Sequence, residues 1–200
     1  MKLVLASGNP GKLREIAEIF ADLNAEILPQ SAFGIESPAE TGTSFAENAL
    51  LKARHAAALS GLAALADDSG IVVDALDGRP GIYSARFAGE GASDDANLDK
   101  LLRELGGVAD AERGAGFHCA AVAVFPHDDP QPIVAEGVWR GRILQQRQGA
   151  SGFGYDPVFY DPLAGKTGAE MTAAEKNALS HRGKAFRQLK DKLREILKRQ

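Results

Sequence analysis

The sequence predicts a protein of the α/β class. In its first half, apolar runs of strand length alternate with amphipathic segments of helix length, an order typical of that class. After residue 114, two long strand-like runs follow each other directly, which indicates an antiparallel hairpin. A chain of 200 residues with 44% hydrophobic content can bury a substantial core. We therefore expect one domain over residues 1–200, with room for two lobes.

Turn residues separate the elements of the first half. Ser44 and Glu47 resemble a capping box that opens a long alanine-rich helix, and Gly61 closes that helix. The acidic segment at 67–70 is expected to interrupt the strand that follows. In order, the sequence predicts a strand at 3–6, a helix at 12–21, a strand at 25–28, a loop at 30–43, a helix at 45–59, a strand at 62–66 that resumes at 71–73, a turn at 77–81 and a helix at 94–105.

The second half begins with a continuous apolar run and ends with an amphipathic helix. That last helix carries Phe186, Leu189, Leu193 and Ile196 at helical spacing, which predicts one buried face. In order, the sequence predicts a strand at 117–125, a turn at 126–130, a strand at 133–144, a glycine-rich loop at 146–157, a short strand at 158–160, a turn at 161–168, a helix at 171–176 and a helix at 182–197.

Composition and charge narrow the classes of function. The net charge is −4 and the basic residues are dispersed except near the C-terminus, which argues against nonspecific nucleic-acid binding. A small anionic ligand needs only a local basic cluster and stays compatible. The single cysteine, Cys119, excludes an intramolecular disulfide and a cysteine-rich zinc site. We find no signal peptide and no apolar run of transmembrane length, so we expect a cytoplasmic protein without a membrane partner.

Residues 7–12, Ser-Gly-Asn-Pro-Gly-Lys, form a tight turn between the first strand and the first helix. Such a turn directs unsatisfied backbone N–H groups, Lys12 and the positive end of the helix dipole toward one point, where a phosphate would bind. The spacing matches neither the Walker A loop nor Gly-x-Gly-x-x-Gly. The alternative is an ordinary strand–helix turn, with Pro10 at the helix start and Lys12 in solvent.

Two adjacent carboxylates, Asp67 and Asp68, interrupt an apolar strand where core residues are expected. If the backbone is extended there, the two side chains point to opposite faces, so one can serve a site while the other is held structurally. A carboxylate in a phosphate site binds Mg²⁺ or takes a proton from an attacking water. The alternative is a hydrogen-bonded turn at a strand end.

Three polar residues upstream are candidates to join this acid pair. Asn48 and Lys52 lie four residues apart on one face of the helix at 45–59, so Lys52 would give one polyphosphate a second lysine. Glu40, in the preceding loop, is a candidate second metal ligand. The alternatives are a solvated helix side for Lys52 and an ordinary surface position for Glu40.

Two motifs in the second half have the chemistry to recognise a base. Residues 152–157, Gly-Phe-Gly-Tyr-Asp-Pro, alternate aromatic rings with glycine, which lets a flat ligand stack closely; a structural loop clamp is the alternative. Residues 180–183, Ser-His-Arg-Gly, place two hydrogen-bond donors at a helix start, near Lys176. The alternative there is a serine N-cap followed by solvated side chains.

These segments occur in the order of one family. The motifs are Ser-Gly-Asn-Pro-Gly-Lys at 7–12, Glu-Thr-Gly-Thr-Ser-Phe-Ala-Glu-Asn-Ala at 40–49, Ala-Asp-Asp-Ser-Gly at 66–70, Pro-Gly-Ile-Tyr-Ser-Ala-Arg-Phe at 80–87, Gly-Phe-Gly-Tyr-Asp-Pro at 152–157 and Ser-His-Arg-Gly at 180–183. On these motifs the chain resembles, over essentially its whole length, the inosine triphosphate pyrophosphatase family, which includes the bacterial dITP/XTP diphosphatases.

The resemblance implies that Mg²⁺-dependent hydrolysis converts dITP, ITP or XTP to the monophosphate and pyrophosphate. It implies a homodimer, and a long mixed twisted sheet flanked by helices, with two lobes around a central active-site cleft. It also implies Asp68 as general base, and Asp68 with Glu40 as metal ligands. The substrate-binding residues that it implies are Ser7, Gly8, Asn9, Pro10, Gly11, Lys12, Lys52, Ser69, Phe153, Gly154, Tyr155, Asp156, Lys176, His181 and Arg182.

Two other functions compete with this one. A related pyrophosphatase for pyrimidine or modified nucleotides would have a Ser/Arg-rich first loop, whereas this chain has Gly-Asn-Pro-Gly-Lys. A nucleotide-binding module without catalysis would have little need for the acidic set of Glu40, Asp67 and Asp68. Hydrolysis of a purine nucleotide therefore accounts best for the motifs.

Overall fold

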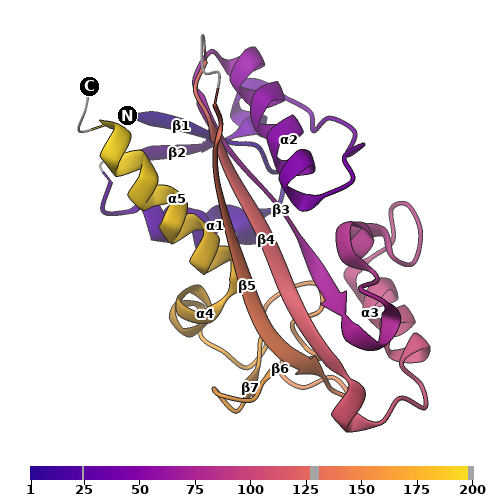
Figure 1. The fold of residues 1–200 in the computed structure, drawn as a ribbon. Coiled ribbons are helices and arrows are strands. Elements are labelled where there is room, and N and C mark those ends of the chain that lie inside the picture. Colours follow the sequence, from indigo (N-terminus) through magenta and orange to yellow (C-terminus); the bar gives the residue numbers. More distant parts are fainter. Residues whose placement is uncertain (24, 127–130, 198–200) are drawn as a thin grey trace. The chain divides into compact units, whose positions relative to one another are not determined.

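A computed structural model describes residues 1–23, 25–126 and 131–197, which contain a seven-stranded sheet with the order β2-β1-β3-β4-β5-β6-β7 (Figure 1). The strands are β1 (Lys2–Leu5), β2 (Glu26–Pro29), β3 (Ala63–Val73), β4 (Gly114–Val124), β5 (Ile133–Ile143), β6 (Phe159–Asp161) and β7 (Lys166–Thr167). The α-helices are α1 (Pro10–Phe20), α2 (Phe45–Ser60), α3 (Asp94–Glu104), α4 (Ala173–Leu179) and α5 (His181–Leu197). The predicted α/β class is confirmed.

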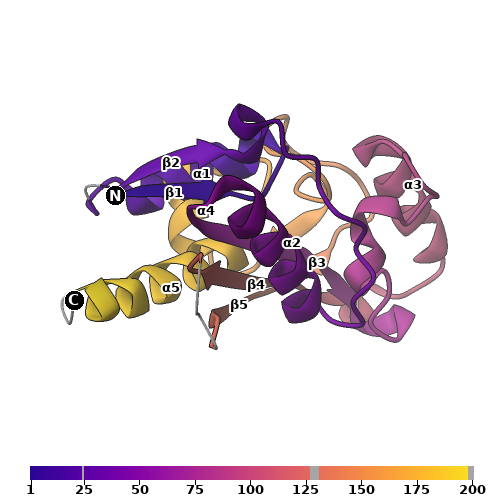
Figure 2. The same ribbon diagram turned by 90° about the horizontal axis from the view of Figure 1, so that it is seen from above.

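Strand directions make the sheet mixed. β1 pairs in parallel with β2 and with β3, and β1 and β2 run side by side in Figure 2. β6 pairs antiparallel with both β5 and β7. β4 and β5 are neighbours, as the predicted hairpin requires, but residues 127–130 of the predicted turn lie outside the described residues.

The chain forms two compact units. Unit 1 contains residues 1–68, 119–137 and 181–200, and unit 2 contains residues 69–118 and 138–180. One domain over residues 1–200 with a central cleft stays a prediction. None of the helices in the described ranges is long and apolar enough to cross a membrane.

Unit 1 has a core on each face of its part of the sheet. Leu3 and Leu5 of β1 point to the face covered by α1 and α5, where they pack with Phe20 and Phe186. Val4 points to the other face, which is packed by alanines of α2. This alternation follows from the two-residue period of a strand. It fixes α1 and α5 on one face and α2 on the other.

The helix ends follow from local chemistry. The Asn9 side chain caps α1 by accepting hydrogen bonds from the N–H groups of Gly11 and Lys12. Ser44 caps α2, while Gly61 ends it in the left-handed conformation at φ 68°. Gly137 of β5 lets the first turns of α5 approach, because a Cβ there would lie 2.8 Å from the Ala185 nitrogen.

Unit 2 has an aromatic core. Phe117, Trp139 and Phe159 pack together, with ring centroids 4.7 Å apart for Phe117 and Phe159. The Trp139 indole N–H donates to the buried Asp161 carboxylate at 2.8 Å, which satisfies both groups. The core supports the loop at 146–157 and the segment just before helix α4, because Tyr155 and Met171 belong to it.

Some predicted boundaries were wrong. β3 continues without interruption through residues 67–70, since the polar side chains there find partners on both faces of the sheet. β2 includes Pro29, and α4 spans Ala173–Leu179 rather than 171–176. The expected turn at 161–168 contains β7, which pairs with β6. α5 starts one residue earlier than predicted, at His181.

Arg113 joins the ends of α3 and β5 within unit 2. Its buried guanidinium donates to the carbonyl oxygens of Leu105, Ile143 and Leu144 at 2.8, 2.8 and 3.0 Å. We expect Arg113→Met to lower the free energy of unfolding by about 2–4 kcal/mol, because three carbonyl groups lose a donor. Urea denaturation measures the loss. Arg113→Lys should recover little of it, and an unchanged midpoint for Arg113→Met would contradict this role.

Candidate active site

Asp67 and Asp68 lie at the end of the unit 1 part of β3, and they pair with lysines from different helices, Lys12 of α1 and Lys52 of α2. Both side chains are buried. Because β3 is continuous here, the predicted opposite orientation of the two carboxylates is confirmed. Each carboxylate organises its own set of charged groups.

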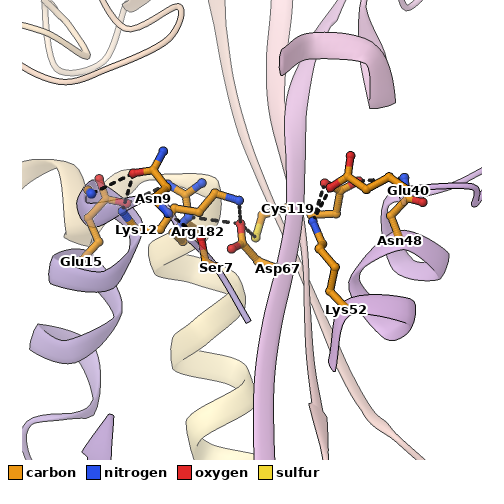
Figure 3. Close-up of polar contacts among 12 residues, drawn as sticks. Ser7, Asn9, Lys12, Glu15, Glu40, Asn48, Lys52, Asp67, Cys119 and Arg182 are labelled. Atoms are coloured by element: carbon orange, nitrogen blue, oxygen red, sulfur yellow. Dashed lines mark hydrogen bonds and ion pairs between the residues drawn. The ribbon is translucent and has the colours of Figure 1, made fainter. Parts of the chain in front are cut away.

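The Asp68 side contains Lys52, Asn48 and Glu40 (Figure 3). Lys52 Nζ donates to Asp68 Oδ1 at 3.1 Å and to Glu40 Oε1 at 2.7 Å. Asn48 Nδ2 donates to Asp68 Oδ2 at 3.2 Å, and Asn48 Oδ1 accepts from the Gly42 N–H. Glu40 is thus beside Asp68: its side chain is partly buried and its carboxylate pairs with a buried lysine, so its role as a metal ligand stays a prediction.

The Asp67 side contains Lys12 and Arg182 (Figure 3). Lys12 Nζ lies 3.0 Å from Asp67 Oδ2, and Arg182 Nε donates to the same oxygen at 3.3 Å. The Cys119 thiol also faces this oxygen, at 3.9 Å. Arg182 Nη1 donates to Glu15 Oε2 at 2.7 Å. Lys12 and Lys52 are therefore held by different aspartates on opposite sides of the strand.

The two aspartates have opposite pKa shifts. Burial raises the pKa of Asp68 above its ordinary value; Lys52 works against this shift, and the neighbouring Glu40 carboxylate adds to it. Burial would also raise the pKa of Asp67, but the charges of Lys12 and Arg182 outweigh it and hold that pKa well below the usual range. Asp67 stays ionised, whereas Asp68 is suited to accept a proton.

The turn at 7–12 differs from the expectation of unsatisfied donors. The N–H groups of Gly11 and Lys12 are bound to Asn9 Oδ1 at 2.8 and 3.2 Å, and the Asn9 N–H is bound to Ser7 Oγ at 3.1 Å. The helix start satisfies these donors because Asn9 is a good N-cap. Lys12 is not in solvent either, since it pairs with Asp67. To bind the N–H groups of this turn, an anion would have to displace the side chains that already accept from them.

The predicted metal ligands, Asp68 and Glu40, meet at Lys52 Nζ. Among the described residues, no three His, Cys, Asp or Glu side chains gather closely enough to hold a metal ion. Mg²⁺ in nucleotide enzymes commonly takes one or two carboxylates and completes its shell with phosphate oxygens and water. The donor chemistry of this pair therefore fits a hard cation such as Mg²⁺.

In unit 2, the loop at 146–157 and helix α4 bring together Phe153, Asp156 and Lys176. Lys176 Nζ lies 2.5 Å from Asp156 Oδ2 and 4.3 Å from the centre of the Phe153 ring. Asp156 Oδ2 also accepts from the Phe153 N–H at 2.9 Å. Gly168 leaves room for this carboxylate, since a Cβ there would lie 2.8 Å from Asp156 Oδ1. Asp156 therefore holds both the Phe153 backbone and the Lys176 ammonium, which lies against the Phe153 ring.

The neighbouring Tyr155 has a structural position. Its buried hydroxyl donates to the Ser84 carbonyl at 2.8 Å, and its ring belongs to the core of unit 2. The Ser84 hydroxyl in turn accepts from the Ile71 N–H. The structure thus favours the loop-clamp alternative for Tyr155.

Two other predicted substrate-binding residues lie close in sequence to the residues above. Gly154 takes the left-handed conformation at φ 61°, and Ser69 is half-buried on β3.

His181 and Arg182 begin α5 in unit 1, and both are buried. Arg182 is only 2% exposed and is held by Asp67 and Glu15. The alternative of solvated side chains is therefore wrong for this motif. Contact of His181 and Arg182 with a base stays a prediction.

Helix α4, which carries Lys176, starts with a capping box of Thr172 and Glu175. Lys166 and Thr172 bind the exposed Glu175 carboxylate and lower its pKa to about 2. Because the folded-state pKa is lowered, the stabilisation is present above the ordinary value near 4.5 and is lost as the pH falls toward 2. We expect the urea midpoint of unfolding to fall less between pH 5 and 2 in Glu175→Gln than in the wild type. An identical fall in both proteins would contradict this assignment.

Comparison with known proteins decides the family. A model of the Ham1 family matches residues 3–192. The chain belongs to the Ham1 family. Its relatives include the dITP/XTP pyrophosphatase of Yersinia pestis, which is 56% identical over 194 residues, with 97% of this chain and 98% of the relative covered. The dITP/XTP pyrophosphatase of Vibrio vulnificus is 55% identical, with 97% of both chains covered. The resemblance drawn from the six motifs is confirmed.

Solved structures support the same relationship. The HAM1 protein from Coxiella burnetii is 46% identical, with a TM-score of 0.89, and the match covers 98% of this chain and 99% of that protein. The Ham1 protein of Staphylococcus aureus is 39% identical, with a TM-score of 0.85 and coverage of 98% and 100%. The mixed sheet with flanking helices is therefore the fold of the Ham1 family.

The sequence reasoning missed one charged residue of this Ham1 site. Glu15 lies three residues after Lys12 and contacts Arg182, yet it was not among the predicted residues. Its position in the first turns of α1, on the face shared with Lys12, was the available signal. Its partner could not be inferred, because Arg182 is 167 residues away in the chain.

Proposed function

We propose that this chain hydrolyses deaminated purine nucleoside triphosphates, such as dITP, ITP and XTP, to the monophosphate and pyrophosphate. The observation that carries the proposal is the pair of buried neighbouring aspartates, one held ionised and the other with a raised pKa. The name of the Yersinia and Vibrio relatives, dITP/XTP pyrophosphatase, supports the same reaction. Removal of pyrophosphate in one step requires attack of water at the α-phosphorus.

In this proposal Asp68 takes the proton from the attacking water. Asn48 and Lys52 hold its two carboxylate oxygens, which fixes the direction in which the group accepts a proton. Burial raises the pKa of Asp68, which favours the protonated form that results from the transfer. General-base catalysis of this kind contributes about 10²- to 10⁴-fold to a rate.

We propose that Lys12 and Lys52 neutralise the negative charge that develops on the leaving pyrophosphate. Asp68 and Glu40 would hold Mg²⁺, which when bound neutralises phosphate charge and polarises the phosphoryl oxygens. Lys52, which is already bonded to both carboxylates, would keep them aligned. The two lysines lie on opposite sides of β3, so they would approach a triphosphate from different directions.

Recognition of the base is assigned to Phe153, Lys176, His181 and Arg182 as a prediction from the family resemblance. A deaminated purine has an oxygen at position 6, where adenine has an amino group. A donor aimed at that position pairs with the oxygen but faces a second donor in adenine. An unpaired buried donor costs about 1–3 kcal/mol, which corresponds to about ten- to hundredfold selectivity. Homodimer formation also stays a prediction.

A panel of nucleotides separates this proposal from its rivals. Pyrophosphate release would be measured with dITP, XTP, dATP, dGTP and dUTP, each with and without Mg²⁺. We expect release from dITP and XTP to depend on Mg²⁺ and to exceed release from dATP and dGTP by at least about tenfold. Preference for dUTP would favour the pyrimidine enzyme. Binding of dITP without turnover would favour a nucleotide-binding module.

A further inference from the structure

Four charged side chains of unit 1 form a chain of alternating sign (Figure 3). Lys12 of α1 contacts Asp67 of β3, Asp67 contacts Arg182 of α5, and Arg182 contacts Glu15 of α1. The contacts are 3.0, 3.3 and 2.7 Å long. Their charges sum to zero, and the chain connects the turn at 7–12 to the Ser-His-Arg-Gly motif.

The contact with Asp67 leaves Lys12 able to bind a ligand. The Asp67 side chain is 0% exposed, whereas that of Lys12 is 17% exposed. An ammonium group has three N–H donors, and one donor is enough for the contact with Asp67. The carboxylate therefore holds the ammonium from the interior, while part of the Lys12 side chain stays accessible.

Arg182 is held from two directions. Asp67 binds its Nε and Glu15 binds its Nη1, and the guanidinium is a rigid planar fork. Two carboxylates on different edges of this fork determine both its position and its plane. Glu15 contacts Arg182, whereas Asp67 contacts both Arg182 and Lys12.

We propose that Asp67 is a positioning residue that orients Lys12 toward the polyphosphate and Arg182 toward the base, with Glu15 completing the hold on Arg182. This inference rests on the proposed function of the same site. It assigns neither Asp67 nor Glu15 a contact with substrate. We therefore expect Asp67 to control both tripolyphosphate binding and selectivity for the base, and Glu15 to control selectivity for the base.

Two variants separate these properties. Asp67→Asn should weaken the binding of inorganic tripolyphosphate about tenfold or more, since Lys12 loses a charged partner that orients it. Glu15→Gln should leave that binding within about twofold. Both variants should lower the ratio of kcat/KM for dITP over dATP, by about tenfold, because each releases Arg182. Isothermal titration with tripolyphosphate and steady-state kinetics give the two readouts.

A matched control tests for loss of structure alone. Asp161→Asn makes the same chemical change at a buried aspartate of unit 2, which accepts from Trp139 and from the Leu163 N–H. It should lower thermal stability without changing tripolyphosphate affinity or the dITP/dATP ratio. If it changes them as Asp67→Asn does, the positioning role is overturned.

The other outcomes also decide the proposal. Unchanged tripolyphosphate binding and an unchanged dITP/dATP ratio in Asp67→Asn would show that the charge chain only stabilises the fold. If Asp67→Asn does not fold, an unchanged ratio in Glu15→Gln still overturns the hold on Arg182. A wild-type protein that does not hydrolyse dITP would refute the proposed function instead, and the tripolyphosphate measurements would then decide the role of Asp67 at Lys12.

Discussion

Asp68→Asn is expected to lower kcat for dITP by about 10²- to 10⁴-fold while the nucleotide still binds. The variant keeps the size of the side chain, and an amide oxygen can still accept from Lys52. It removes the group that takes a proton from water. Single-turnover kinetics would measure the rate, and equilibrium titration of dITP would measure binding.

Asp77→Asn is a suitable control for this experiment. Asp77 lies in a turn at φ 52°, a conformation that asparagine also adopts readily, and it belongs to no part of the candidate site. Its kcat should equal that of the wild type. Comparable turnover in Asp68→Asn and Asp77→Asn would contradict the assignment of Asp68 as the base.

Asp156→Asn is expected to produce the largest loss of stability. Asp156 and Lys176 form a buried pair with side chains that are 4% and 8% exposed, so the change leaves a buried ammonium without its charged partner. Removal of one member of such a pair costs about 3–5 kcal/mol. For a chain of this length, that corresponds to a fall in Tm of about 10 °C. Differential scanning calorimetry would measure it.

The double variant Asp156→Asn, Lys176→Met tests the physical cause. It removes the buried ammonium as well, so it should recover part of the lost Tm. Glu104→Gln is the matched control, because it breaks an exposed pair with Arg79 and should cost less than about 1 kcal/mol. A Tm for Asp156→Asn equal to that of the control would refute the role of this pair.

Local patterns predicted most of the fold. The capping residues Ser44 and Gly61 mark the ends of α2, which the structure has at or near the predicted positions. Errors arose where partners distant in sequence overrode a local signal. Residues 67–70 look like a strand break, but β3 continues because Lys12, Lys52 and Arg182 satisfy the two carboxylates.

The residues of the candidate site were largely predictable, but their pairings were not. The motifs identified Asp68, Lys52 and Asp156 as chemically important residues, and the structure gives each of them a buried charged partner. The sharing of Asp67 between Lys12 and Arg182 joins positions 115 residues apart from β3 to α5. Periodicity and spacing report only on neighbours in the chain, so such a contact needs the fold.

Hydrolysis of an equal mixture of dITP and dATP with Mg²⁺ in water labelled with ¹⁸O tests directly whether this chain removes pyrophosphate from deaminated purine nucleotides. Mass spectrometry of the products identifies both the base that reacts and the phosphorus that water attacks. We expect ¹⁸O in dIMP, unlabelled pyrophosphate, and dAMP formed at least about tenfold more slowly. Label in pyrophosphate or orthophosphate, or equal formation of dIMP and dAMP, would contradict the proposed function.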